Sequence, residues 1–266
     1  MIKAYSFFAL SLLLSTTALG ASKSSISRGG FGFLYADTNH FNNPGLFSQL
    51  RGFAIAGDME KNLDTDDIST SPSVVYGNGR VGLGVTAQRT GPNPMNPGTS
   101  TVSAVAGFCF NFAKNMAMVG VGYERSIDGN APNDGLVSGT ITYQPTGKGF
   151  SIGGGYSMTI NADTDVKAAI GALGYAFNPM VQVEGTFAVN DLTDMTDYTI
   201  GGFLNITGRI LYVTGGFTME NLSTEKTAMA RLGFVLGNAV DISGYGSKLL
   251  VTGSEYNVGG VFRLRL

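Results

Sequence analysis

The chain has 266 residues, a formal net charge of −2, one cysteine and 39 glycines. The near-neutral charge provides no basic surface for nucleic acid, and Cys109 alone cannot form an intrachain disulfide bond. The glycine content is about twice the usual ~7%. Many of these glycines lie inside apolar runs, where they allow tight curvature and close approach of backbones, so they favour a curved sheet.

Residues 1–20 have the pattern of a secretory signal peptide. Lys3 supplies the positive start, Phe7 to Leu14 is a short apolar run, and Ala18-Leu19-Gly20 offers small residues for cleavage before Ala21. This run is too short to span a bilayer as a helix, which needs ~20 apolar residues, and no later segment approaches that length. We therefore expect cleavage and export. The alternative is a retained N-terminal anchor helix.

Hydrophobicity alternates with a period of two residues from Leu50 onward, in runs of about ten residues. Between Val181 and Val189, the odd positions are apolar or glycine, whereas the even positions include Gln182, Glu184 and Thr186. A helix would distribute these apolar residues all around its axis. The pattern therefore predicts strands with one apolar face and one small or polar face.

Short and long connections alternate along the chain. We expect short turns at residues 77–79, 114–115, 146–149, 178–179, 208 and 237–238. Between them lie longer polar links that carry most of the carboxylates. Membrane barrels show this alternation because tight turns face the periplasm and longer loops face outside. The fold class is therefore all-β, a closed antiparallel transmembrane barrel of about 14 strands, with 12 as the alternative.

The segment between the signal peptide and the barrel does not have strand periodicity throughout. Asn42-Asn43-Pro44-Gly45 ends a short apolar stretch with turn chemistry. The expected organisation is a signal peptide at residues 1–20, an N-terminal plug at 21–48 and the barrel at 49–266.

Two motifs resemble the FadL family of long-chain fatty-acid transporters, in which a hatch segment precedes the first strand. Residues 36–46 match that segment at Asn43, Pro44 and Leu46, with one small residue missing between Pro44 and Gly45. Residues 76–85 resemble the family's strand with a Gly-x-Gly-Val core. These motifs cover a small part of a chain that is much shorter than typical members.

The resemblance implies a fourteen-stranded barrel in which Asn43, Pro44, Gly45 and Leu46 belong to a plug. A shift of that plug would open a path for hydrophobic ligands. The short loops put in doubt the external ligand groove that family members build from long loops. The alternative is that Asn-Pro-Gly is only a turn joining a periplasmic arm to the barrel.

The final run, 256–266, is expected to be the last strand. Its pattern resembles the C-terminal signal that the outer-membrane assembly machinery recognises, although the chain ends in leucine rather than an aromatic residue. The residues of this signal are Asn257, Gly259, Phe262, Leu264 and Leu266.

Strand alternation also predicts a set of charged residues that point into the barrel. They either line an aqueous path and set its selectivity, or pair with one another and fill a closed barrel around a plug. These residues are Arg80, Glu124, Glu184, Arg231, Arg263 and Arg265.

Neither catalysis nor a bound cofactor or metal is expected. A hydrolase needs a histidine base beside its nucleophile, and the only histidine, His40, lies among turn residues. One His and one Cys also cannot supply the three or four ligands of zinc without several carboxylates.

Two further motifs match binding signatures by letter only. Gly77-x-Gly79-x-x-Gly82 is followed by residues at strand period, whereas a dinucleotide fingerprint requires a helix. Asp64-x-Asp66-Asp67 lacks the Gly and Glu of an EF-hand loop, so a solvated acidic loop is expected.

The sequence thus predicts transport of hydrophobic or small solutes across the bacterial outer membrane. The expected partners are outer-membrane lipid and lipopolysaccharide, the assembly machinery and hydrophobic small molecules, with no nucleic acid. A structural barrel or adhesin that presents acidic loops is the alternative, and a soluble secreted β-protein is a third interpretation.

Overall fold

The computed structural model describes residues 43–91, 99–112, 115–127, 135–160, 166–178, 180–189, 191–193, 196–208, 210–221, 225–237, 239–250 and 256–266. The expected signal peptide and most of the expected plug, including His40, lie outside these residues. Among the described residues, no helix is long and apolar enough to cross a membrane.

Almost all described residues belong to strands of one antiparallel sheet, preceded by the 3-10 helix η2 (Pro44–Gln49). The strands are β1 (Arg51–Asn62), β2 (Ile68–Thr70), β3 (Ser73–Asn78), β4 (Val81–Gly91), β5 (Thr99–Phe112), β6 (Asn115–Ser126), β7 (Gly135–Pro145), β8 (Gly149–Ile160), β9 (Lys167–Asn178), β10 (Val181–Val189), β11 (Tyr198–Thr207), β12 (Leu211–Glu220), β13 (Glu225–Leu236), β14 (Val240–Leu249) and β15 (Tyr256–Arg265).

The sheet closes on itself because β15 pairs with β1, with Ala54 opposite Arg265 and Asn62 opposite Asn257. Segments β2 and β3 are two parts of one strand, since both pair with β1 on one side and with β4 on the other in a single register. Pro72, which has no N–H to donate, interrupts that strand. Its carbonyl still accepts a hydrogen bond from the Ala87 N–H at 3.1 Å. The predicted barrel of 14 strands is therefore confirmed.

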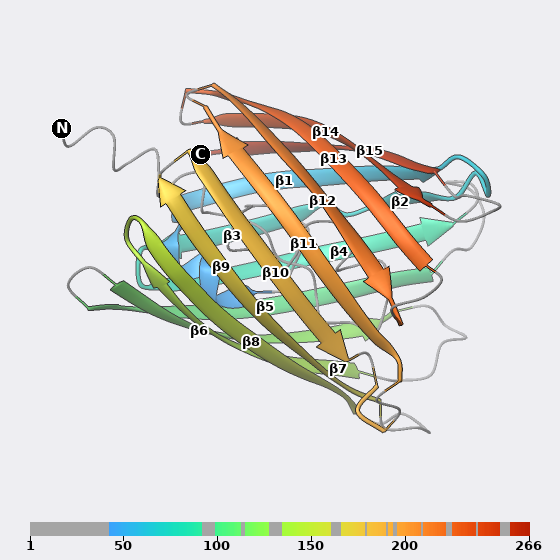
Figure 1. The fold of residues 1–266 in the computed structure, drawn as a ribbon, viewed down its shortest axis with the longest axis horizontal. Helices are drawn as coiled ribbons and strands as arrows, with labels where there is room; N and C mark the ends of the chain where they lie inside the picture. The colour runs from blue at the N-terminus through green and yellow to red at the C-terminus, as the bar shows by residue number, and fades with distance from the viewer. Residues whose placement is uncertain are drawn as a thin grey trace.

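The connections divide the barrel into two ends (Figure 1). Short turns, the start of β1 and the C-terminus share one end, which we call the short-turn end; the longer links share the other, the loop end. Asn78 and Asn178 stabilise two of the short turns, because each side-chain oxygen accepts hydrogen bonds from the two N–H groups at i+2 and i+3. Followed once around the barrel, the strand register accumulates a stagger of about 14 residues.

The two faces of the barrel wall differ as the alternation predicts. On β4, Leu83 and Val85 are more than half exposed on the outer face, whereas Thr86 is 6% exposed on the inner face. The same contrast separates Phe187 from Glu184 on β10. An apolar belt that faces outward around a closed sheet is what a bilayer requires of a spanning barrel.

Aromatic side chains border this apolar belt. Phe150, Tyr175 and Phe177 form a chain of ring contacts at the short-turn end, with centroids 4.6 and 4.9 Å apart. Phe187 and Tyr198 contact each other at the loop end, with centroids 5.8 Å apart. Phe and Tyr thus supply the interfacial girdles in a chain that has no Trp.

Candidate functional site

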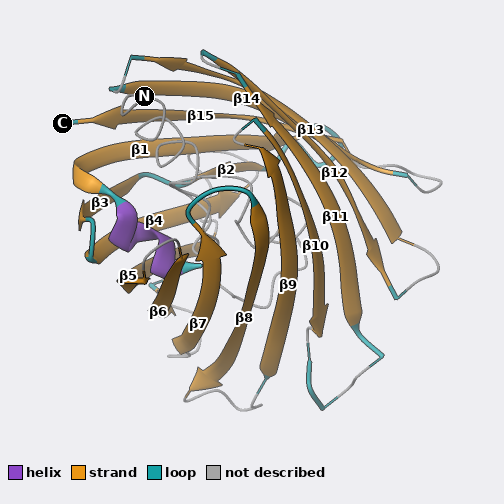
Figure 2. Ribbon diagram, turned by 60° about the vertical axis from the view of Figure 1, so that its left-hand side comes forward, coloured by secondary structure: helices purple, strands orange, loops and turns teal. Residues whose placement is uncertain are grey.

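The helix η2 lies inside the barrel, at its short-turn end. It runs along the inner wall beside β3, β4, β5, β6 and β7 (Figure 2). Leu46, Phe47 and Leu50 are almost completely buried there, and the chain then enters β1 at Arg51. The Gly79 N–H donates to the Leu50 carbonyl at 2.9 Å, which ties the segment to the turn between β3 and β4. Residues 43–50, the described part of the predicted plug, thus lie at one mouth of the lumen, and their action as a plug stays a prediction.

A row of inward-facing glycines allows this close packing. Gly77, Gly82, Gly107 and Gly120 are directly opposite one another on β3, β4, β5 and β6, and we call them the glycine row. A Cβ atom on Gly82 would overlap the Phe47 backbone, and one on Gly107 would overlap the Pro44 carbonyl. The plug therefore packs its backbone directly on the bare backbone of the wall.

Two of these glycines, Gly77 and Gly82, come from the motif that matches a dinucleotide fingerprint by letter. The structure places that motif in the hairpin between β3 and β4, where the third glycine, Gly79, has a φ of +86° in the turn. A side chain is disfavoured at this φ, whereas glycine adopts it readily. Each of the three glycines therefore has a structural reason to be there.

Asn43 fixes the start of the plug to the wall. Its side-chain Nδ2 donates to Thr142 Oγ1 at 2.7 Å, and its Oδ1 accepts from Thr140 Oγ1 at 3.3 Å. Both threonines face inward on β7 and are buried, as is Asn43 itself. A buried amide needs such partners, because leaving one polar atom unsatisfied costs about 1–3 kcal/mol.

The opposite wall, from β11 to β15 and β1, is filled by aromatic side chains that lie flat across glycines of the neighbouring strand. A Cβ on Gly233 would overlap the Tyr212 ring, and one on Gly259 would overlap the Tyr245 ring. Each tyrosine is directly opposite its glycine in the register. Rings laid across glycines in this way shield the backbone and fix the register.

These tyrosines reach carboxylates two strands away. Tyr212 Oη donates to Asp241 Oδ1 at 3.0 Å, and Asp241 also forms an ion pair with Arg263. Tyr245 Oη contacts Asp58 Oδ1 at 3.1 Å and Glu60 Oε2 at 2.8 Å. On this wall, side chains rather than a chain segment fill the lumen.

The predicted lumen charges fall into different environments. Arg231 is 4% exposed and donates to Ser243 Oγ at 2.5 Å, and Glu184 is also 4% exposed. Glu124 accepts from Ser103 Oγ at 2.8 Å, on the plug side of the lumen. Arg265 lies at the end of β15, next in the inward series after Arg263.

Arg80 does not belong to this set, and its prediction is wrong. It is exposed in the turn between β3 and β4, before the strand resumes at Val81. The Arg80 N–H donates to the Asn78 side-chain oxygen Oδ1 at 2.9 Å, which holds it in the turn. Because Arg80 lies in a turn, strand alternation does not determine the direction of its side chain.

Asp58, Glu60 and Asp241 were not expected in the lumen. The first two lie on the last part of β1, which continues to Asn62. The outward series of Phe53, Ile55 and Met59 is the sequence signal that would have placed both carboxylates inward.

The predicted assembly-signal residues all lie at the C-terminal strand. Asn257 and Gly259 face inward, Phe262 is 47% exposed on the outer face, and Leu266 is 71% exposed at the chain end. The Leu266 N–H donates to the Phe53 carbonyl at 2.9 Å, so this strand completes the barrel against β1. Its role in assembly stays a prediction.

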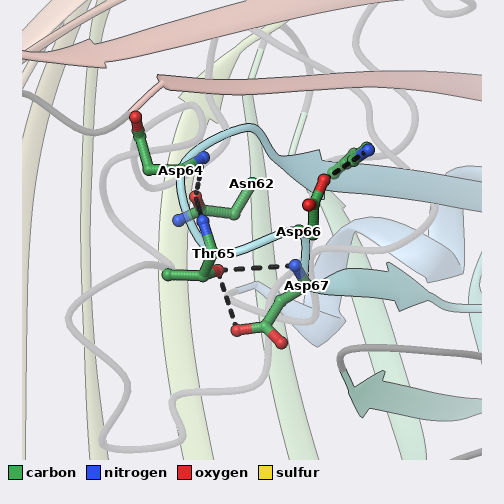
Figure 3. Close-up of polar contacts among 6 residues, drawn as sticks. Asn62, Asp64, Thr65, Asp66 and Asp67 are labelled. Atoms are coloured by element: carbon green, nitrogen blue, oxygen red, sulfur yellow. Dashed lines mark hydrogen bonds and ion pairs between the residues drawn. The ribbon is translucent and has the colours of Figure 1, made fainter.

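The acidic loop between β1 and β2 is held by its own side chains (Figure 3). Asn62 Oδ1 accepts from the N–H groups of Asp64 and Thr65, and Thr65 Oγ1 donates to Asp67 Oδ2 at 2.9 Å. Asp66 pairs with Lys61 at 2.7 Å, and this contact lowers the pKa of its exposed carboxyl. The carboxylates do not converge, and within the described residues no cluster of His, Cys, Asp and Glu could hold a metal ion.

Comparisons with known proteins give a likeness in fold. No family model matches the chain, and no curated protein matches its sequence. The Ralstonia pickettii toluene transporter TbuX superposes with a TM-score of 0.57 at 12% identity, over 84% of this chain and 92% of that one. The Acinetobacter baumannii outer membrane protein Omp33 does so with 0.57 at 11%, over 82% and 100%.

The CymD monoaromatic hydrocarbon channel also superposes, with a TM-score of 0.57 at 11% identity, over 84% of this chain and 91% of that one. At such low identity the likeness concerns architecture only. The chain has the fold of outer-membrane channel barrels.

Proposed function

We propose that the protein lies in the bacterial outer membrane and transports hydrophobic or small solutes across it. The observation that carries this proposal is a closed barrel with an apolar outer belt whose short-turn mouth is partly closed by the buried segment 43–50. In membrane barrels the short turns face the periplasm. The segment would therefore control the periplasmic mouth.

Two observations favour transport by a plugged barrel of the FadL kind. The residues that resemble that family's hatch, Asn43 to Leu46, are the ones that lie against the wall inside the lumen. Two of the barrels with the same fold are described as a toluene transporter and a monoaromatic hydrocarbon channel. By this analogy the solute is a small apolar molecule, and the plug must shift for it to pass.

A test of this proposal is to displace the plug from inside the wall. Gly107→Val places a side chain where the Pro44 carbonyl lies, so the segment can no longer pack on the glycine row. The matched control is Gly171→Val, because a Cβ on Gly171 has no atom within 4 Å. Both proteins are reconstituted in planar bilayers for conductance and in vesicles for uptake of toluene.

We expect Gly107→Val to conduct more than the wild type and Gly171→Val to match the wild type. Equal currents from all three proteins would contradict a plug. A barrel that carries neither ions nor toluene in any variant would favour the structural or adhesive alternative.

A further inference from the structure

Charges on the barrel wall are sorted by face. In the described strands, every carboxylate whose side chain is described has the inward parity. They are Asp58, Glu60, Glu124, Glu184, Glu220 and Asp241. Most cations have the outward parity, which they share with the exposed apolar residues of the same strands. The outward cations near the loop end are Lys61, Arg89, Arg125, Lys167, Lys226 and Lys248.

These outward cations share one height on the barrel. Each lies within the last or first few residues of its strand at the loop end, at the edge of the apolar belt. At the short-turn end, Arg51 is the outward cation of the described strands, while Arg80 and Lys148 are in turns. The outer surface therefore carries a belt of positive charge at one membrane interface.

Two cations of the belt lie on adjacent strands, β13 and β14, beside a tyrosine on β15. Lys248 on β14 is directly opposite Tyr256 on β15, and its Nζ lies 4.7 Å from the centre of the Tyr256 ring. Lys226 on β13 is opposite Leu250, since the Leu250 N–H donates to its carbonyl at 2.6 Å. Lys226 and Lys248 are thus diagonal neighbours on one face, with their Cα atoms about 7–8 Å apart.

An ammonium group at the edge of a bilayer extends toward the headgroups while its methylenes stay on the apolar surface. A ring beside it is the usual interfacial anchor and also stabilises the cation through its face. No described strand offers these two lysines a carboxylate on the outward face. The arrangement is complementary to anions that arrive from the lipid side.

We propose that Lys226, Lys248 and Tyr256 bind the phosphate groups of the phosphorylated glycolipid in the outer leaflet. This inference rests on the outer-membrane location and the orientation proposed above. Two lysines at diagonal positions offer separate charges to the phosphates, and the tyrosine sets the direction of Lys248. The outward apolar residue below them, Val258, would contact the acyl chains.

The test uses the full mature chain, purified as a folded barrel in detergent that contains no lipid. Bisphosphorylated lipid A, dephosphorylated lipid A and inorganic phosphate are added separately, and retained lipid is counted by native mass spectrometry and titrated for affinity. The variants are Lys226→Gln/Lys248→Gln and the control Arg51→Gln/Lys148→Gln, which removes two cations from the other end. Altered mobility of unheated samples in gels shows that each variant is folded.

We expect the wild type and the control to retain bisphosphorylated lipid A and the double variant to bind it about 25-fold more weakly, at about fivefold per lysine. Tyr256→Leu should weaken it a few-fold. Equal retention by the two double variants, equal retention of dephosphorylated lipid, or displacement by inorganic phosphate at the lipid's own concentration would overturn the site. Because these results come from a folded barrel in detergent, they do not depend on whether it transports solutes.

Discussion

The two walls of the lumen are closed by different means. On β3 to β7 the wall is smooth because of the glycine row, and a segment of backbone packs on it. On β11 to β15 and β1 the wall carries its own filling of tyrosines, arginines and carboxylates. A segment held by backbone contact can leave as a unit, whereas side chains rooted in the wall cannot. The proposed transport therefore places the movable side at the first wall.

The largest effect is expected on the fixed side. Asp241→Ala removes the carboxylate that pairs with Arg263, whose side chain is 10% exposed. Breaking a buried pair in this way costs about 3–5 kcal/mol of unfolding free energy. Urea unfolding of the barrel in lipid vesicles measures the loss. The control is Asp241→Leu/Arg263→Met, which removes both charges and should recover most of the lost unfolding free energy. An Asp241→Ala variant as stable as the wild type would show that the pair is solvated.

Glycine substitutions compare the two walls directly. Gly82→Ala meets the backbone of Phe47, which can yield only if the plug moves, and should cost about 3 kcal/mol. Gly233→Ala meets the ring of Tyr212, which can rotate, and should cost about 1 kcal/mol. The same unfolding assay ranks them. A larger loss of stability in Gly233→Ala than in Gly82→Ala would contradict the distinction between backbone packing on one wall and side-chain packing on the other.

Tyr245→Phe removes one hydroxyl from the fixed side. Its contacts with Asp58 and Glu60 are lost, but both carboxylates keep other partners, so the expected cost is about 1 kcal/mol. The ring still covers Gly259. Conductance should stay at the wild-type level, and a large increase would mean that this wall also gates the lumen.

The smallest effect lies outside both walls, in the acidic loop. The hydrogen bond and charge of Lys61 hold the pKa of Asp66 below its ordinary value of 3.8. The stabilisation is therefore present above about pH 4 and is lost as the pH falls through the lowered pKa. An NMR titration should show this midpoint, and Lys61→Gln should return it to the ordinary value. An unchanged midpoint in Lys61→Gln would show that Lys61 does not lower the pKa of Asp66.

Local periodicity explains which parts of the fold could be predicted. The run Val181–Val189 became β10 with the predicted faces, because side-chain direction in a strand depends only on neighbouring residues. The short turns followed from Asn and Gly at their corners. Both features are contained within a few consecutive residues.

The arrangement within the lumen depends on register between distant strands, which no local pattern contains. Gly107 and Gly120 are recognisable as glycines, but only the pairing of β4, β5 and β6 brings them into one row. Tyr212 likewise meets Asp241 across two strands. The inward position of Asp58 depends on where β1 ends, and strand ends are the least determined feature of a sequence.

A reversible cross-link between plug and wall tests the central claim most directly. A Cβ added to Gly45 would lie 2.9 Å from the Met118 Cβ, so a shift of about 1 Å gives the ~3.5–4.5 Å that a disulfide needs. In a Cys109→Ala chain, Gly45→Cys/Met118→Cys should block toluene uptake into vesicles when oxidised and restore it when reduced. Equal uptake in both states would show that solutes do not need the plug to move.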